Sequence, residues 1–391
     1  MDHRISAEER AAFRGCRRRW DLTSPNRMNL EPATRSGLVD LDRAVKDALA
    51  IHYFPGMWDW PPAIVAPLVV KGFDRSMGDQ QDLVSSERSL TDSEAEQWHR
   101  GLDDGRRMLA RYADWATSAD RFAPVRVESD FEVQIPDPAR PGGSLPTATA
   151  GAVLYVGRLD ALVIDEFDAY WILRHRVVDR WTPRYQLELD EESIMACWAW
   201  ESFYLGMTIN GTIDNELRMD DDTYDGPIPP PGPGSPPGLS GAPAERRVRQ
   251  SEGSGGGRNV PQHRRISAVA HEPTSAPRVE VDEGPGFRRT WIRRRSEEKA
   301  AAADRLAREA VAMIDPSVFT DPTPSDEQCR PCAYVPPCVA LNQGQDPAAL
   351  LADGYRRRPA EPELVERLGS VSWGFGRGAA PPLFGADRKS T

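Results

Sequence analysis

Lysine is scarce in this chain of 391 residues. It occurs only at Lys46, Lys71, Lys299 and Lys389, so arginine supplies almost all of the positive charge. An arginine side chain stays protonated near neutral pH and is a poor base, whereas a lysine with a shifted pKa can take part in proton transfer. No lysine lies between Lys71 and Lys299, so the middle of the sequence cannot supply a catalytic lysine.

Long apolar runs are also absent. Asp2, His3 and Arg4 directly follow Met1, so we expect no secretory signal peptide. No run of about 18 apolar residues could span a membrane. We therefore expect a cytoplasmic protein without a membrane partner. The 5 cysteines are not expected to form a disulfide framework in such a reducing compartment.

Net positive charge is missing as well, because the formal charge is -11 at pH 7. A general nucleic-acid-binding coat would be basic, so any contact with DNA has to use a local patch. Arginine runs that could form such patches lie at residues 17–19, 288–289, 293–295 and 356–358. Each single run is more typical of a solvated protein face.

The distribution of apolar residues predicts an α/β fold in which a mixed sheet is flanked by helices. Helical spacing is found at residues 7–20, 38–52, 64–73, 93–115, 190–205 and 297–314. Strand patterns are found at residues 127–135, 151–165, 169–178, 207–219 and 287–294, where the second of these is expected to be a strand pair.

Proline and glycine divide the chain. Residues 221–263 are rich in both and in serine, cannot bury apolar surface, and are expected to form a disordered insertion. Residues 343–391 are expected to be a flexible tail. Residues 1–220 and 264–342 together would then form a single domain.

The cysteines near the C-terminus are closely spaced. Cys329, Cys332 and Cys338 form a C-x2-C-x5-C pattern stiffened by prolines, which is typical of a metal site. A fourth ligand is needed, and Cys16 beside three arginines is a better thiolate candidate than Cys197 within an apolar helix. The site could hold an iron–sulfur cluster or a zinc ion.

The stretch "WILRHRVV" at residues 171–178 has the apolar composition of a buried strand but contains Arg174 and Arg176. Side chains two positions apart share one face of a strand, so these guanidinium groups should point the same way. They require an anion. Asp160 on the neighbouring strand is the expected partner, and a nucleic-acid phosphate is the alternative. His175, on the opposite face, is expected to be a packed structural residue.

One N-terminal cysteine combined with C-x2-C-x5-C resembles the iron–sulfur staple of RecB-like PD-(D/E)XK nucleases, including the CRISPR-associated exonucleases. In that family a [4Fe–4S] cluster joins the two ends of the nuclease domain. "YVGRLDALVID" resembles the family's GRxD strand, with Asp160 as the metal-binding aspartate, and "ESDFEV" resembles the preceding strand, which carries a glutamate. The resemblance covers most of residues 5–220 and 285–342.

The catalytic positions of the family are degenerate in this sequence. The second carboxylate falls on Arg174 and the lysine on Arg176, while the glutamine and tyrosine of the next helix fall on Ser193 and Cys197. The helical histidine falls near residues 45–46. A fixed positive charge about 4 Å from a divalent ion repels it by several kcal/mol. We therefore do not expect a catalytic Mg²⁺ or Mn²⁺.

These observations support three hypotheses. The first is a pseudonuclease, a nuclease-fold protein with impaired catalysis that binds DNA, as single strands or ends, or a protein partner. The second is an active Mg²⁺- or Mn²⁺-dependent DNA exonuclease whose site is rebuilt from other carboxylates: Glu128, Glu132, Asp165, Asp168 and Asp179. The third is a redox- or iron-responsive regulator that uses the cluster as its sensor.

Overall fold

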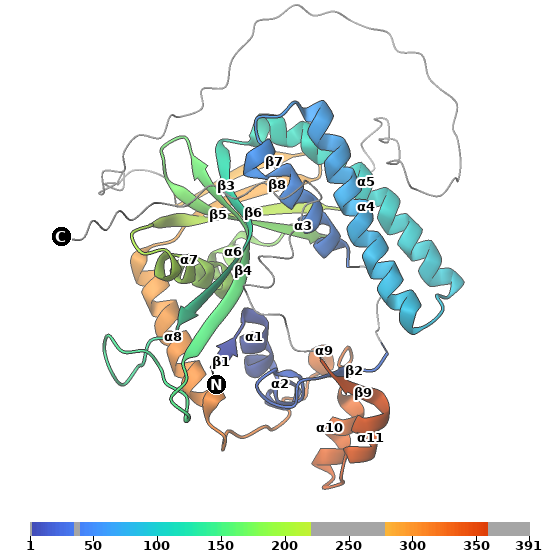
Figure 1. The fold of residues 1–391 in the computed structure, drawn as a ribbon, viewed down its shortest axis with the longest axis vertical. Coiled ribbons are helices and arrows are strands. Elements are labelled where there is room, and N and C mark those ends of the chain that lie inside the picture. Colours follow the sequence, from blue (N-terminus) through green and yellow to red (C-terminus); the bar gives the residue numbers. More distant parts are fainter. Residues whose placement is uncertain (1, 35–39, 220–277, 359–391) are drawn as a thin grey trace, which may run out of the picture.

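The computed structural model describes residues 2–34, 40–219 and 278–358 (Figure 1). The expected insertion at residues 221–263 and the tail beyond residue 358 lie outside the described part. Within it, the chain forms an α/β fold in which a mixed sheet is flanked by helices. The predicted fold class is confirmed at this level.

The sheet has strands in the order β1-β4-β5-β6-β8-β7, and β3 pairs with the other edge of β4. The chain makes an antiparallel meander through β3, β4 and β5 and then crosses over to β6, which runs parallel to β5. Residues 151–165 form one long strand and not the expected pair. The strands are β1 (His3–Ile5), β3 (Phe122–Gln134), β4 (Val153–Asp165), β5 (Tyr170–Val178), β6 (Ile209–Arg218), β7 (Val279–Gly284) and β8 (Phe287–Arg293).

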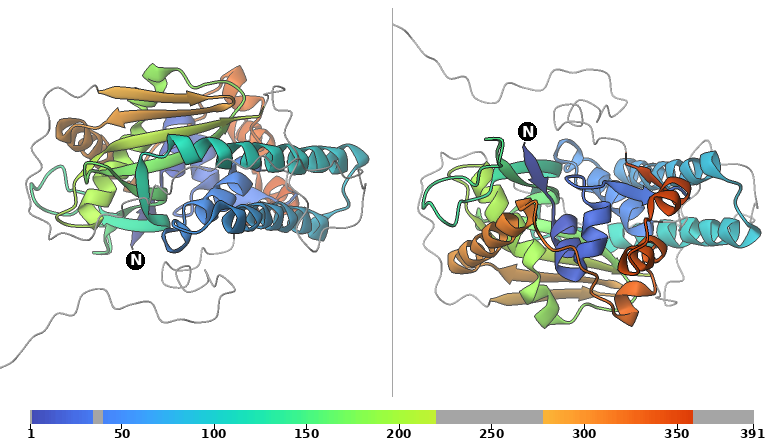
Figure 2. Two further views of the ribbon diagram at one scale, coloured as in Figure 1. Left: turned by 90° about the horizontal axis from the view of Figure 1, so that it is seen from above. Right: turned by 90° about the horizontal axis from the view of Figure 1, so that it is seen from below.

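One face of the sheet is covered by α3 (Leu41–His52), the short 3-10 helix η1 (Pro55–Met57), α4 (Pro62–Glu87) and α5 (Asp92–Ala119). α4 and α5 lie side by side and extend past the sheet (Figure 2). α4 is much longer than the apolar pattern at residues 64–73 predicted. Its second half is polar in sequence, but it still buries Met77 and Val84, since α5 packs along it.

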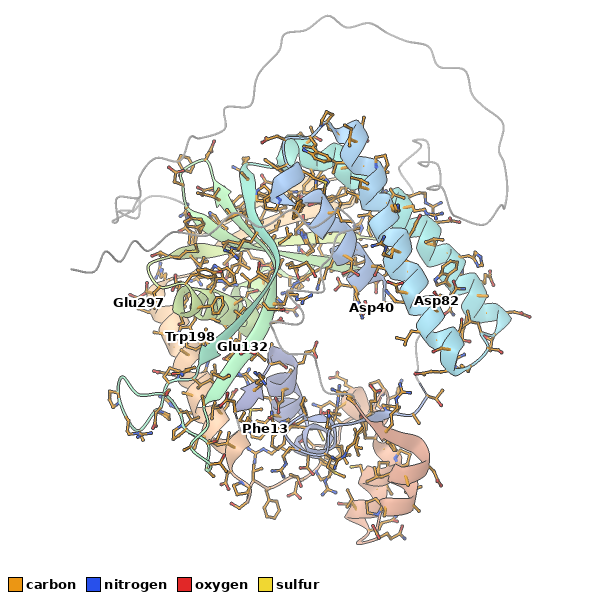
Figure 3. All side chains as sticks on the ribbon, viewed as in Figure 1. Phe13, Asp40, Asp82, Glu132, Trp198 and Glu297 are labelled. Carbon is orange, nitrogen blue, oxygen red and sulfur yellow. The ribbon has the colours of Figure 1, made fainter. Side chains whose placement is uncertain are left out.

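The other face is covered by α1 (Ala7–Gly15), α2 (Arg17–Thr23), α6 (Arg184–Leu189), α7 (Glu191–Phe203) and α8 (Ser296–Ile314). Phe13 of α1 and Trp198 of α7 both belong to this layer (Figure 3). The helix expected at residues 7–20 is interrupted at Cys16, whose backbone is extended with φ -157° and ψ 109°. This residue ends one helix and begins the next.

A small lobe joins the two ends of the described chain beside α2 (Figure 1). Its strands β2 (Leu30–Pro32) and β9 (Tyr355–Arg357) pair antiparallel, and its helices are α9 (Asp326–Cys329), α10 (Val335–Asn342) and α11 (Ala348–Gly354). α11 and β9 fall within residues expected to be a flexible tail. The Tyr334 and Tyr355 rings stack 5.3 Å apart, and Arg356 pairs with Glu31 and Glu87, which fixes this segment.

None of the helices in the described ranges is both long enough and apolar enough to cross a membrane.

Candidate functional site

The four cysteines expected to act together line a single pocket in the small lobe. Cys16 comes from the break between α1 and α2, Cys329 from the end of α9, Cys332 from the turn that follows, and Cys338 from α10. The pocket encloses about 410 Å³ of empty space, part of it open to solvent. Cys197 is remote from it and lies in the α7 core, where burial raises the pKa of its thiol to about 12.

Local contacts place these thiols. Because Cys16 interrupts the helix, its side chain leaves the helical layer and turns towards the later cysteines. Arg18 ties α2 to the segment before α9 by donating from Nε to the Thr320 carbonyl over 2.6 Å. Ser325 caps α9 by accepting from the Gln328 amide. Segments from opposite ends of the sequence are thereby held around one pocket.

The thiols influence one another electrostatically. Burial raises the pKa of Cys338, and the neighbouring thiols Cys16, Cys332 and Cys329 add to the effect, while Arg18 opposes it. Across the described residues, no group of three or more histidine, cysteine, aspartate or glutamate side chains is arranged to hold a single metal ion.

A second candidate site lies where strands β4 and β5 separate. The β4–β5 ladder ends at the pair Ala161–Leu173, and the other end of β4 pairs with β1. Beyond this fork, two backbone amides of β5 are no longer paired with β4. His175 N donates to Asp160 Oδ2 over 2.7 Å, and Val177 N donates to Asp42 Oδ1 of α3 over 2.8 Å. Two carboxylates therefore replace the missing strand.

Arg174 and Arg176 point together, as expected for alternate residues of a strand, towards the start of α7. Their common partner is Asp190, the N-cap of α7. Asp190 Oδ2 lies 2.6 Å from Arg174 Nη1 and also accepts from Arg176 Nη2. Arg174 pairs further with Glu192 at 3.0 Å, and Ser193 Oγ bonds to the same cluster.

The expected pairing of these arginines with Asp160 is therefore wrong at the level of direct contacts. Asp160 is bonded to the His175 amide and interacts with Arg174 only as a more distant charge. The reason is the fork. Asp160 would face Arg174 if the ladder continued, but the strands separate after Ala161, and the N-terminus of α7 fills the space beside the arginines.

The pKa shifts in this cleft follow from burial and charge. Burial would raise the pKa of Asp190, but Arg174 and Arg176 outweigh it, and the pKa lies below its ordinary value. Burial raises the pKa of Asp214, a fully buried β6 carboxylate 3.4 Å from Arg176 Nη2. Burial also raises the pKa of Asp160, although Lys46 and Arg174 act against it.

Lys46 also lies in the cleft, at the helix position near which the resemblance places the family's helical histidine. It lies on α3, and its Nζ is 2.9 Å from Asp42 Oδ2. Burial would lower its pKa, but the charges of Asp160 and Asp42 outweigh burial and raise the pKa. The available sequence signal was the pair Asp42 and Lys46 at positions i and i+4 of an amphipathic helix, which favours a salt bridge on one face.

Most of the residual carboxylates proposed for a rebuilt site have partners elsewhere in the fold. Glu132 pairs with Arg4 at 3.0 Å, and Asp165 caps the β4–β5 turn and accepts from Trp171 Nε1. Asp168 lies in the same turn with a φ of 62°. Glu128 pairs with Arg158 and is electrostatically coupled to Asp160, and its pKa is raised by burial.

His175 is a structural residue, as expected. Its side chain is 2% exposed, stacks on Tyr53 and shares a hydrogen bond between Nδ1 and Asn215 Nδ2 of 2.9 Å. Burial lowers its pKa well below the ordinary value, so the ring is neutral.

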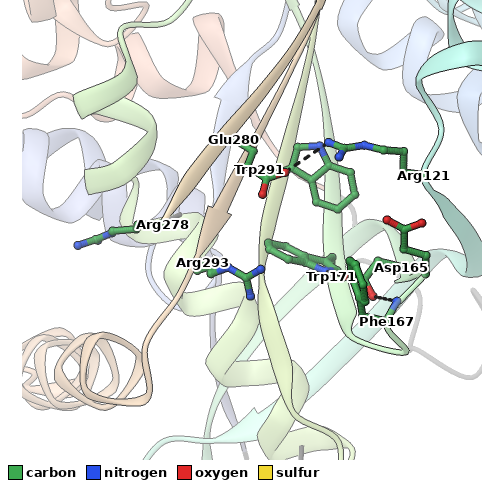
Figure 4. Close-up of a pocket in the computed structure, with 9 residues that line it drawn as sticks. Arg121, Asp165, Phe167, Trp171, Arg278, Glu280, Trp291 and Arg293 are labelled. Atoms are coloured by element: carbon green, nitrogen blue, oxygen red, sulfur yellow. Dashed lines mark hydrogen bonds and ion pairs between the residues drawn. The ribbon is translucent and has the colours of Figure 1, made fainter. Parts of the chain in front are cut away.

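Another pocket lies beside the β4–β5 turn (Figure 4). Trp171 and Trp291 meet edge to face with ring centroids 5.1 Å apart, and Arg121 and Arg293 cover their outer faces. Phe167 at the turn is 80% exposed. The two indoles are almost fully buried, and Arg121 is paired with Asp282, so these groups mainly stabilise the sheet.

No protein-family model matches the chain, and a search of curated proteins finds no match. Its function has to be argued from the two sites described above.

Proposed function

We propose that this protein is a pseudonuclease: a RecB-like PD-(D/E)XK fold joined at its ends by a [4Fe–4S] cluster, impaired in hydrolysis, and acting by binding nucleic acid or a protein partner. The observation that carries the proposal is the capture of Arg174 and Arg176 by Asp190. These arginines stand where the family resemblance would place a metal-binding carboxylate and a lysine.

The order of elements supports the resemblance. A helix, α3, precedes three antiparallel strands, β3 to β5, and α7 then crosses over to the parallel strand β6. Asp160, the aspartate of the GRxD-like strand, lies at the fork between β4 and β5. The arginine-bearing strand and the helix that follows it meet at the same place.

The cleft does not fit the Mg²⁺ or Mn²⁺ that the family uses. Hard divalent ions need several oxygen ligands with few competing cations. Here Asp190 is shared between two guanidinium groups, and Lys46 pairs with Asp42 beside Asp160. The carboxylates of Asp42, Asp160 and Asp190 already have a protein cation or an amide donor, so we expect no catalysis through a metal ion in this cleft.

The lining of one pocket by four cysteines supports the proposed cluster. The ligands of the cluster would be Cys16, Cys329, Cys332 and Cys338. The bound cluster would cross-link the N-terminal helices to the C-terminal lobe. A zinc ion, held tetrahedrally by four sulfurs at about 2.3 Å, is the alternative occupant of the same pocket.

Binding of a nucleic-acid phosphate would use the same arginines. The Arg176 side chain is 28% exposed and that of Arg174 is 16% exposed, so Arg176 is the more accessible. A phosphate would have to compete with Asp190, which predicts weak and strongly salt-dependent binding of single strands or DNA ends. A protein partner is the outcome to expect if no nucleic acid binds.

A second candidate function, the iron–sulfur regulator, is favoured by a link between the two sites. Arg10 and Arg14 of α1, directly before Cys16, both pair with Glu191 and Glu309. Glu191 follows Asp190 in sequence, so a change at the thiol pocket that moved α1 would be felt beside the arginine pair. Coupling of this kind requires two discrete arrangements of α1.

The decisive experiment combines anaerobic purification with a nuclease assay. The proposal expects a brown protein that contains iron and sulfide in equal amounts and does not degrade labelled single-stranded DNA with Mn²⁺. DNA cleavage that is lost in Asp160→Ala would refute it and favour the exonuclease. A colourless protein with stoichiometric zinc would remove the cluster from the proposal.

A binding assay then separates the remaining readings. DNA binding should fall steeply with salt and weaken in Arg176→Gln, while Arg140→Gln, which changes an arginine with a 65% exposed side chain between β3 and β4, should have little effect. Equal weakening in both variants would show that general charge, and not the cleft, binds DNA.

A further inference from the structure

The fork between β4 and β5 raises a problem of charge. Asp160 and Asp42 place two carboxylates on alternate amides of one strand, those of His175 and Val177, and Glu128 lies close enough to influence Asp160. In a partly buried cleft, carboxylates placed this close together would destabilise the fold without a counter-charge. A nuclease of the resembling family would supply a divalent ion at this point.

Lys46 is placed to provide that counter-charge. Its ammonium is 2.9 Å from Asp42 and is electrostatically coupled to Asp160. The side chain comes from α3, which packs against β5 and β4, and is 32% exposed. The carboxylate that Lys46 contacts is itself held at the fork, because Asp42 Oδ1 accepts from the Val177 amide.

The carboxylates on both sides of the cleft face protein cations. On the α7 side, Asp190, Glu192 and Asp214 face Arg174 and Arg176. On the α3 side, Asp42 and Asp160 face Lys46.

We propose that Lys46 occupies the place of a divalent cation at the β4–β5 fork, so that the cleft is held together without metal. Its ammonium neutralises Asp42 and Asp160, and its removal uncovers a carboxylate site that takes a divalent ion. The inference rests on the proposed function, in that it explains why the fork is stable although the family's metal does not fit. Beyond the proposed function, the inference names Lys46 as the stabilising residue and predicts that a variant without it gains divalent-ion binding.

The test compares Lys46→Met with the wild type, using Mn²⁺ itself as the probe. Electron paramagnetic resonance of free Mn²⁺ should detect about one bound ion per Lys46→Met chain and none per wild-type chain. Addition of Mn²⁺ at about ten times its dissociation constant should raise the melting temperature of the variant by roughly 3 °C and leave the wild type unchanged.

Three controls define the site. Lys46→Arg keeps the charge and should bind no Mn²⁺. Lys71→Met removes an exposed lysine of α4 and should behave like the wild type. Lys46→Met combined with Asp160→Asn removes a ligand and should lose the acquired Mn²⁺ binding.

Equal Mn²⁺ binding by the wild type and Lys46→Met would overturn the inference, as would a folded Lys46→Met that binds none. If Lys46→Met does not fold, the double variant decides: recovered folding supports a counter-ion role, and failure of both variants contradicts it. DNA cleavage by the wild type would refute the pseudonuclease proposal without depending on these measurements, so the two failures can be told apart.

Discussion

Asp190 holds two arginines from a neighbouring strand while it also caps a helix. Its carboxylate accepts from both Arg174 and Arg176, and its second oxygen accepts from the Glu192 amide at the start of α7. The helix N-terminus and the guanidinium groups both favour the charged form. One side chain therefore links β5 to α7.

Asp190→Asn keeps a good N-cap residue and removes only the charge. We expect the free energy of unfolding to fall by about 3 kcal/mol, because two largely buried guanidinium groups lose their common counter-ion. Glu188→Gln is the control, since Glu188 pairs with the exposed Arg184 and should change stability by less than about 1 kcal/mol. Urea denaturation measures both, and equal losses would contradict the role given to Asp190.

The pH dependence of stability should contain a contribution from His52. Burial lowers its pKa from 6.5 to about 4, and the nearby charge of Arg289 adds to the effect. Between these values the unfolded chain binds a proton that the folded protein excludes, so stability falls as the pH falls from about 6.5 towards 4. His175 acts in the same direction.

His52→Gln should remove this contribution. Between pH 7 and pH 5 the wild type should lose about 2 kcal/mol more unfolding free energy than the variant, from about 1.4 kcal/mol per pH unit. Denaturation curves at the two pH values give the difference. If the wild type and His52→Gln lose the same amount of unfolding free energy between pH 7 and pH 5, His52 becomes protonated in the folded protein.

At the scale of elements, close packing of α4 against α5 depends on a glycine. A Cβ on Gly105 of α5 would lie 2.1 Å from Phe73 Cζ of α4, whereas a Cβ on Gly78 of α4 would meet nothing within 4 Å. The same substitution should therefore have opposite effects on the two helices.

Gly105→Ala is expected to destabilise the protein by about 1 to 3 kcal/mol through overpacking. Gly78→Ala is expected to stabilise it by up to about 1 kcal/mol, because alanine loses less backbone entropy in a helix. Thermal unfolding of both variants measures the effects. A stabilising Gly105→Ala would show that Phe73 can move aside at little cost.

Periodicity in the sequence was sufficient for most elements but not for their contacts. The strand at residues 170–178 and the helix after Asp190 were predictable because apolar residues repeat with the period of each structure. The far half of α4 was missed, since its polar residues are held by α5, a tertiary effect that no local pattern contains.

The candidate sites were predictable to different degrees for similar reasons. Cysteine spacing pointed to Cys16 and the three later cysteines, because few other roles require thiols at such intervals. The prediction that Arg174 pairs with Asp160 was wrong, because the sequence indicates that two strands are neighbours but not where they separate. The resemblance placed the family's helical histidine near Lys46, but it did not predict that Lys46 pairs with Asp42 beside Asp160, because this contact depends on how α3 packs against the sheet.

At the scale of the whole molecule, the small lobe joins the beginning and the end of the described chain. Cys16 and the Leu30–Pro32 strand come from one end, and the remaining cysteines and the Tyr355–Arg357 strand come from the other. The lobe has a small apolar core centred on Leu22, Leu30 and Tyr334. A group bound by the thiols would therefore contribute strongly to its stability.

Cys16→Ser and Cys197→Ser should separate the two kinds of thiol. Cys16→Ser is expected to lose bound iron and visible absorption and to become sensitive to protease within residues 326–358. Cys197→Ser should retain iron and lose only about 1 to 3 kcal/mol from placing a hydroxyl in the α7 core. Iron analysis and limited proteolysis give the result, and retention of full iron by Cys16→Ser would exclude it as a ligand.

The pairing of β2 with β9 also sets an order of events during synthesis. Asn29 and Arg358, whose backbones meet at the end of this pair, are separated by 329 positions. At usual translation rates the first strand waits roughly 20 to 60 s for its partner to be made. During that time the Cys16 thiol has no companions from the later segment. The pocket can therefore be filled only after nearly the whole described chain has left the ribosome, and a prematurely terminated chain would carry an incomplete set of thiols.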